Sequence, residues 1–281
     1  HISDWDVSLI TDMSELFNDK NTFNDDISNW NVSNVTNMYL MFSGATSFNQ
    51  DLSGWNVSSV TNIHGIFKAT SFNQDISSWN VFNVTDMGNV FKNTPFNQDI
   101  SSWDVSNVID MGDIFNGASS FNQDLSTWDV SNVILMDYMF NNATDFNQDI
   151  STWAVSNVTN MYSMFYGATS FGQDISNWDV SNVTTMESMF RDTHNFNSDI
   201  SGWNVSSVTN MTAMFYNAMI FNQDLSNWDV SNVTNMANIF NGTDSSGIPI
   251  NGLNALSDEN KCAIHTTWSA NNNWPYDWTE N

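Results

Sequence analysis

Nine of the 31 acidic side chains of this 281-residue chain recur at one repeated position. A Ser stands two residues after each of these Asp residues, so its O–H and backbone N–H can bond the carboxylate in an Asx-type turn. Clustered carboxylate oxygens also suit Ca²⁺, and Asp99, Asp124, Asp149 and Asp174 are the candidate ligands. We favour the turn, because the Asn-Gln-Asp order lacks the glycine-rich nonapeptide of calcium-binding β-rolls. The nine residues are Asp26, Asp51, Asp75, Asp99, Asp124, Asp149, Asp174, Asp199 and Asp224.

The sequence offers little for catalysis. No HExxH, GxSxG, GxGxxG or Walker-type loop is present. Four histidines occupy unrelated repeat positions. Cys262 has no counterpart in other repeats, and we expect it to be a small core residue. No carboxylate pair is marked out by an apolar pocket that would raise one pKa. We therefore predict that the protein is not an enzyme and requires no cofactor, with calcium the one candidate ion. The histidines are His1, His64, His194 and His265.

These side chains are set out by a repeat, marked by a Trp every 25 residues except for two steps of 24. A fixed period of this length is typical of a solenoid. Trp128 and Val130 alternate with polar residues, which predicts a short strand with one buried face. Val133, Met136, Met139 and Phe140 follow the spacing of one short helical or 3₁₀ turn. The Trp column runs through Trp5, Trp30, Trp55, Trp79, Trp103, Trp128, Trp153, Trp178, Trp203 and Trp228.

The predicted fold is a leucine-rich-repeat-like solenoid of about ten coils over residues 1–242, with parallel short strands plus a short helix or 3₁₀ turn in each coil. Trp, Val, Met and Phe fill its core, because a residue needed in every coil is usually a packing residue. Residues 243–281 are predicted to form a C-terminal helical cap. A helix is expected from Leu256 to Trp268 with Ser257 as N-cap, followed by an aromatic tail that folds back over the last coil.

Composition restricts the partners. With 31 Asp and Glu against five Lys and Arg, the formal charge is −26, which repels nucleic-acid and membrane phosphates. We therefore expect no nucleic-acid binding and no direct membrane binding. Salt screens such a surface, so a saline exterior suits it and we expect an extracellular or cell-surface location. The chain begins partway through a repeat, and we expect a monomeric fragment of a longer chain.

One stretch carries a specific resemblance. Residues Phe146 to Phe165 read Phe-Asn-Gln-Asp-Ile-Ser-Thr-Trp-Ala-Val-Ser-Asn-Val-Thr-Asn-Met-Tyr-Ser-Met-Phe, and close variants recur over residues 1 to about 242. This unit resembles the BspA-like leucine-rich-repeat surface proteins of bacteria. The resemblance implies export and a role in attachment, and it identifies no ligand.

A specific partner can be recognised only at outward positions that differ between coils. Such residues cluster in the later coils, and Tyr and Arg are typical of binding surfaces. We predict a surface protein or glycan as partner, bound at Tyr138, Tyr162, Tyr166, Arg191 and Tyr216. The rival surface is the polar strand face, with Asp129, Asp179 and Asp229. Two other functions stay open: a calcium-stabilised spacer in an adhesin, and ice binding by a Thr column that Ile109 and Ile134 interrupt.

Overall fold

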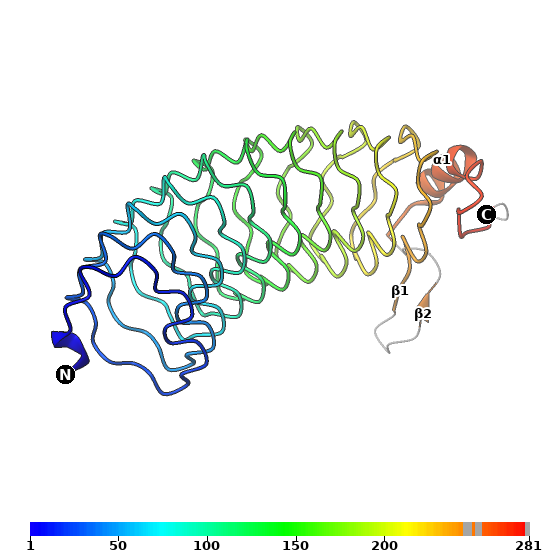
Figure 1. The fold of residues 1–281 in the computed structure, drawn as a ribbon. Helices are drawn as coiled ribbons and strands as arrows, with labels where there is room; N and C mark the ends of the chain where they lie inside the picture. The colour runs from blue at the N-terminus through cyan, green and yellow to red at the C-terminus, as the bar shows by residue number, and fades with distance from the viewer. Residues whose placement is uncertain (244–248, 251–254, 279–281) are drawn as a thin grey trace.

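The chain is a curved stack of coils closed at its C-terminal end by one helix (Figure 1). The structure is a computed structural model, which describes residues 1–243, 249–250 and 255–278. Its elements are a 3₁₀ helix η1 (Ile2–Asp4), the antiparallel pair β1 (Gly242–Thr243) and β2 (Pro249–Ile250), and the helix α1 (Asp258–Trp268). Among the described residues, no helix is long and apolar enough to span a bilayer.

Neighbouring coils are joined by one parallel β-bridge each, and nine such bridges connect ten coils from Asp12 to Asn235. The bridge residue lies seven positions after the Trp, as Leu135 lies after Trp128. Parallel pairing between coils is therefore present, but the strand predicted at Trp128 and Val130 is wrong. At that position the indole N–H of Trp128 bonds the preceding coil, at the carbonyl of Ile100 (3.1 Å).

The segment after the bridge is a series of four-residue turns, so the predicted helical turn is also wrong. The N–H groups of Met136, Tyr138 and Phe140 donate to carbonyls of the next coil at 3.1, 2.8 and 2.8 Å. The N–H of Met139, between them, donates to the Met136 carbonyl in its own turn (3.3 Å). Tyr138 and Asn142 have φ of +56° and +55°, a left-handed conformation that no α-helix contains. We call the eight residues from the bridge residue onward the ladder segment, and its exposed side the ladder face.

The core consists of columns of the same or similar apolar residue types, as predicted. Trp128 is 3% exposed, and Met136, Met139 and Phe140 are fully buried. Aromatic rings stack from coil to coil, so each coil covers the apolar surface of its neighbour.

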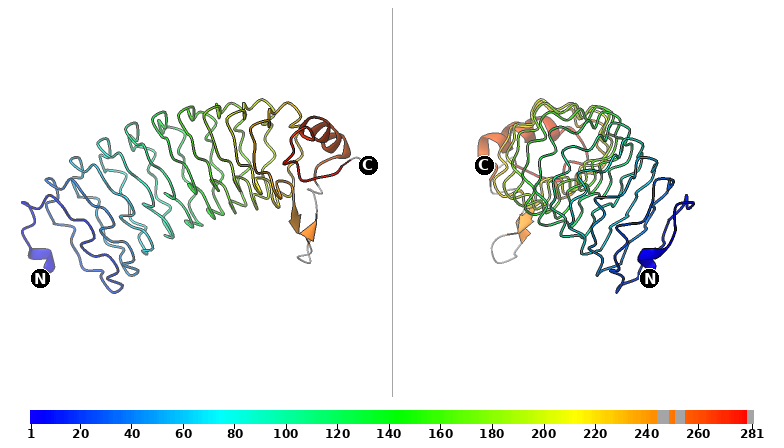
Figure 2. Two further views of the ribbon diagram at one scale, coloured as in Figure 1. Left: turned by 45° about the vertical axis from the view of Figure 1, so that its right-hand side comes forward. Right: turned by 90° about the vertical axis from the view of Figure 1, so that its left-hand side faces the viewer.

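The spacing between coils increases across the stack and bends it. Backbone pairing at the bridge sets about 4.8 Å. Between the same two coils, ring centroids are 5.6 Å apart for Phe140–Phe165, 6.0 Å for Phe146–Phe171 and 6.4 Å for Trp153–Trp178. The ladder face is therefore the inner, concave side of the arc. Figure 1 and Figure 2 agree with this, because β1, at the end of the last ladder segment, leaves from the inner side.

The cap takes the place of a further coil. The Trp268 ring stacks on Trp228 (6.0 Å), and its indole N–H donates to the Leu225 carbonyl (3.2 Å), as coil tryptophans do. The side chain of Ser257 accepts from the N–H of Asn260, so the predicted N-cap is confirmed, with the helix starting at Asp258. Cys262 is exposed, so the expectation that it is a core residue is wrong.

Candidate binding surface

Variation between coils is concentrated on the ladder face. A residue there supplies mainly its backbone to the turns, so its side chain is free to differ. The third residue of the ladder segment shows this most clearly, with ten coils carrying eight residue types. In coil order these are Ser14, Tyr39, His64, Gly88, Gly112, Asp137, Tyr162, Glu187, Thr212 and Ala237.

Three of the five predicted binding residues lie side by side at the seventh position of successive ladder segments. The Arg191 guanidinium lies 5.4 Å from the ring centroid of Tyr166 and 4.5 Å from that of Tyr216. All three are partly exposed. Stacking of a guanidinium between two rings is a cation–π arrangement, which favours this position of the three long side chains.

The other two predicted residues form a pair, with Tyr162 in the coil of Tyr166 and Tyr138 in the coil before it. The rings of Tyr138 and Tyr162 meet edge to face, with centroids 4.8 Å apart. A hydrogen bond with Tyr162 is the main cause that raises the pKa of the Tyr138 hydroxyl. The structure thus brings the five residues together as a pair and a triplet. Tyr162 and Tyr166 are the third and seventh residues of one ladder segment.

An acidic group at the centre of the ladder face was missed by sequence reasoning. The imidazole of His64 contacts Asp86 (Nδ1 to Oδ1, 3.0 Å), and this hydrogen bond raises the pKa of His64. Asp110 and Asp137 face the space above Gly112, where a Cβ atom would lie 3.1 and 3.4 Å from their Oδ1 atoms. Burial raises the pKa of both carboxyls. The only sequence signal was the pair of glycines at successive third positions.

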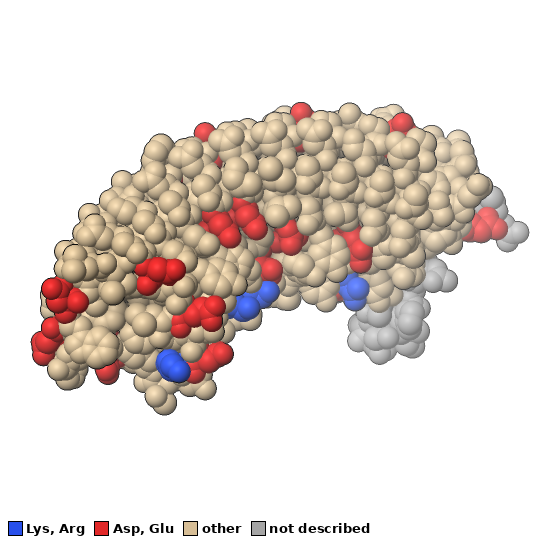
Figure 3. Space-filling view, in the orientation of Figure 1, with Lys and Arg blue, Asp and Glu red and all other residues tan. Residues whose placement is uncertain are grey.

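The cation nearest to this acidic group is already paired. Lys92 Nζ lies 2.8 Å from Asp113 Oδ1. Figure 3 shows acidic groups gathered along the lower front of the arc, with few basic groups among them. The centre of the ladder face therefore carries an excess of negative charge.

The Asp column on the opposite side of the coils forms the predicted turns. The N–H of Ser126 donates to Asp124 Oδ1 (2.8 Å), and Asp99, Asp149 and Asp174 each accept in the same way at 2.9 Å. Bonds from the following Ser, its backbone N–H first, lower the pKa of Asp99, Asp149 and Asp174. Within the described residues, no three His, Cys, Asp or Glu side chains converge as a metal site. Calcium binding stays a hypothesis.

The rival polar surface is occupied by the same kind of turn. The carboxylates of Asp129, Asp179 and Asp229 accept from the N–H groups of Ser131, Ser181 and Ser231 at 3.0, 3.1 and 3.0 Å. Each carboxylate therefore already bonds its own chain.

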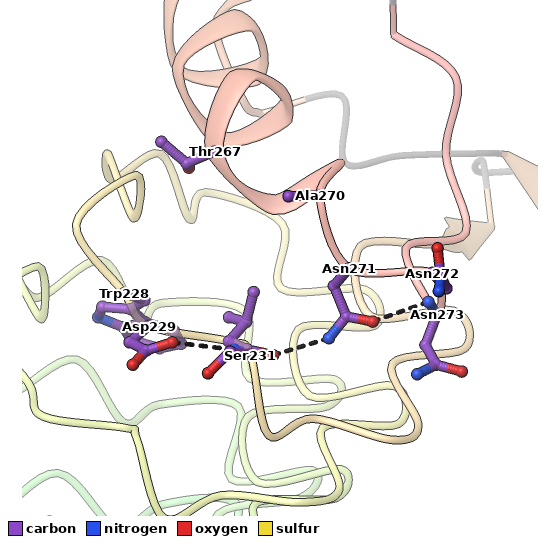
Figure 4. A pocket seen from close by; sticks show the side chains of 9 residues that line it. Trp228, Asp229, Ser231, Thr267, Ala270, Asn271, Asn272 and Asn273 are labelled. Carbon is purple, nitrogen blue, oxygen red and sulfur yellow. Dashed lines mark hydrogen bonds between the residues drawn. The ribbon is translucent and has the colours of Figure 1, made fainter.

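A polar pocket of about 490 Å³ lies between the last coil and the end of α1 (Figure 4). On one side, Asp229 accepts from Ser231. Across from it, Asn271 Nδ2 donates to the Val230 carbonyl (2.7 Å). The bonds from Asn271 fasten the cap to the last coil.

Comparison with known proteins gives a family and no activity. No curated protein matches the chain. One family model, described as "Mycoplasma protein of unknown function, DUF285", matches residues 1–95, 81–170 and 148–253. These overlapping stretches extend over all the coils, as expected for tandem copies of one unit. The chain is therefore a repeat protein with a period of about 25 residues, and it belongs to the DUF285 family.

Proposed function

We propose that this protein is a non-enzymatic binding module of a cell-surface adhesin, and that its ladder face binds a surface protein. The observation that carries the proposal is the concentration of side-chain variety on this face, where Tyr138, Tyr162, Tyr166, Arg191 and Tyr216 form two contacting groups. Most columns elsewhere repeat, because each coil must match its neighbours.

The Tyr and Arg groups suit a protein partner. Tyrosine offers a large contact area for few rotatable bonds, and Arg is enriched at the centres of protein interfaces. Arg191 is held between Tyr166 and Tyr216, so less side-chain freedom is lost on binding. The face is also concave, which lets one partner contact several coils together.

The extracellular setting and the leucine-rich-repeat likeness are parts of the same proposal. The charge of −26 is best screened in saline surroundings. Coils of 25 residues joined by parallel bridges on the inner side of an arc support a likeness to leucine-rich repeats, with Trp, Met and Phe in the packing positions.

The proposal is tested on an array printed with extracellular-matrix proteins and glycans. Two triple variants are compared: Tyr162→Ala with Tyr166→Ala and Tyr216→Ala, and Asp129→Asn with Asp179→Asn and Asp229→Asn. The second set is a matched control, because other coils carry Asn at that position, as at Asn31, Asn56 and Asn204. We expect the Tyr set to weaken protein binding at least ~10-fold and the Asn set to leave it unchanged.

Three results would count against the proposal. Loss of binding in the Asn set alone, with both variants folded, would move the site to the polar face. Binding of glycans only would replace the protein partner by a carbohydrate. Binding to nothing on the array would favour a structural spacer.

A further inference from the structure

Two coils lack a hydrogen bond that most other coils form between a Thr hydroxyl and the preceding coil. The residue before the bridge is Thr in eight of the ten coils, and its hydroxyl typically donates to a carbonyl of the preceding coil, as from Thr184 to Thr159 (3.1 Å). Coils five and six carry Ile109 and Ile134 instead, which are 42% and 40% exposed. They are neighbours, because the N–H of Ile134 donates to the Ile109 carbonyl (2.9 Å). The two coils thus replace a bonded hydroxyl with a partly exposed apolar side chain, which leaves apolar surface in contact with water.

Two carboxylates follow this apolar pair closely in sequence and form no ion pair with a Lys or Arg of the described residues. Asp110 follows Ile109 directly, and Asp137 lies three residues after Ile134. The Asp110 carboxylate accepts the N–H of Gly112 (2.8 Å). Among the described residues, no Lys or Arg nitrogen lies within ion-pair distance of Asp110 or Asp137, since Lys92 is paired with Asp113.

The charge of Asp110 and Asp137 and the exposure of the two Ile side chains indicate which chemical group would complement this surface. Asp110 and Asp137 are partly exposed and face one another over Gly112, so both negative charges are held in one place. A cation placed between them would relieve their repulsion, and an apolar group beside it would cover the two Ile side chains. One chemical type supplies both: a Lys or Arg with an aliphatic side chain next to it.

We propose that Ile109, Ile134, Asp110 and Asp137 form a docking surface for a basic segment of a partner protein, in which Lys or Arg stands beside aliphatic residues. The inference rests on the proposed function, since it takes the ladder face, extended by the residue before each bridge, to bind a protein, and it adds the chemistry of that partner. Charge complementarity carries it: the chain has five Lys and Arg against 31 Asp and Glu, and the nearby Lys92 is paired with Asp113, so a basic partner suits this site.

The test uses a synthetic peptide of alternating Lys and Leu, titrated calorimetrically into the full chain at low ionic strength. Two double variants remove the site: Ile109→Thr with Ile134→Thr, and Asp110→Asn with Asp137→Asn. The first restores the Thr of the other coils, so its fold is preserved. Controls remove similar groups elsewhere: Met219→Thr with Ile220→Ser for exposed apolar area, and Asp25→Asn with Asp145→Asn for charge.

We expect each site variant to raise the Kd of the Lys-Leu peptide about 10-fold, and each control to change it less than about 2-fold. A Glu-Leu peptide should not bind, and a Lys-Ser peptide should bind more weakly. Equal affinity of all four variants for the Lys-Leu peptide would overturn the inference, because binding would then depend on the net charge of the chain alone.

The same variants separate this inference from the proposed function. If the Tyr162, Tyr166 and Tyr216 alanine variant loses its array partner while both site variants keep it, the ladder face binds a protein but this docking surface is refuted. If the site variants lose the array partner as well, both proposals are supported. If the site variants bind the Lys-Leu peptide weakly while no array protein binds the wild type, the proposed function fails alone.

Discussion

Truncation of one central tryptophan measures how much the stacked core contributes to stability. Trp128 is 3% exposed and lies between coils on both sides. Trp128→Ala should lower the free energy of unfolding by about 3 to 5 kcal/mol, from lost apolar burial and the cavity that remains. Part of this loss is polar, because the Ile100 carbonyl loses the indole donor at 3.1 Å.

A second substitution separates the two contributions. Trp128→Phe keeps an aromatic ring but removes the N–H, so the carbonyl of Ile100 is left without that donor. The expected cost includes about 1 to 3 kcal/mol for the unsatisfied group. Trp5→Ala is the matched control, because Trp5 occupies the same repeat position but is 62% exposed. Its cost should stay below about 0.5 kcal/mol.

Urea unfolding followed by far-UV circular dichroism and by fluorescence gives the three differences, with the m-value checking that the same surface unfolds in each variant. A cost below about 1 kcal/mol for Trp128→Ala, or a cost equal to that of Trp5→Ala, would refute the packed-column reasoning.

Other outcomes follow from the same contacts. A chelator should leave the Tm unchanged if the Asx turns already bond the carboxylates of the Asp column. A rise in Tm of many degrees at millimolar calcium would show that ions bind between the Asp residues of neighbouring coils. Asp110→Asn should raise the Tm at pH 7, because ionising a carboxyl whose folded pKa is raised costs stability, and the gain should shrink as pH falls through that pKa; an unchanged gain would contradict this. Asp99 has a lowered folded pKa, so its ionised carboxylate stabilises the fold. This stabilisation should be lost as the pH falls below about 3.9, the unfolded value, and through the folded pKa. The pH dependence of the difference in Tm between wild type and Asp99→Ala measures it. Trp268→Ala should expose Trp228 and lower the Tm, with faster proteolysis of the cap; protection equal to wild type would show that the cap does not need this ring.

The sequence alone determined the features that are local or that repeat. A Trp every 25 residues fixed the period and the buried columns, because identical neighbours impose identical packing. The Asx turns followed from an Asp and a Ser two residues apart, and the cap helix followed from Ser257 before Asp258 and Glu259. The prediction that Tyr and Arg residues bind a partner also came from the sequence, from the positions where coils differ.

Tertiary structure decided where the backbone hydrogen bonds go. Met136, Met139 and Phe140 are buried at spacings of three and one, which a helical turn and a turn ladder satisfy equally. The ladder forms because alternate N–H groups bond the next coil, a partner that the local sequence does not contain. For the same reason the parallel pairing falls at Leu135 and not at Trp128.

The arc and the side-chain groups depend on register between coils. Coils lie closest where backbone pairs with backbone and farther apart where rings stack, so the ladder face became the concave one. Arg191 meets Tyr166 and Tyr216, and Asp137 faces Asp110, across separations of about one coil in sequence. The sequence identified these residues as outward-facing. Which of them are in contact is set by the alignment of the stacked coils, because that alignment depends on hydrogen bonds between coils and not on the sequence of a single coil.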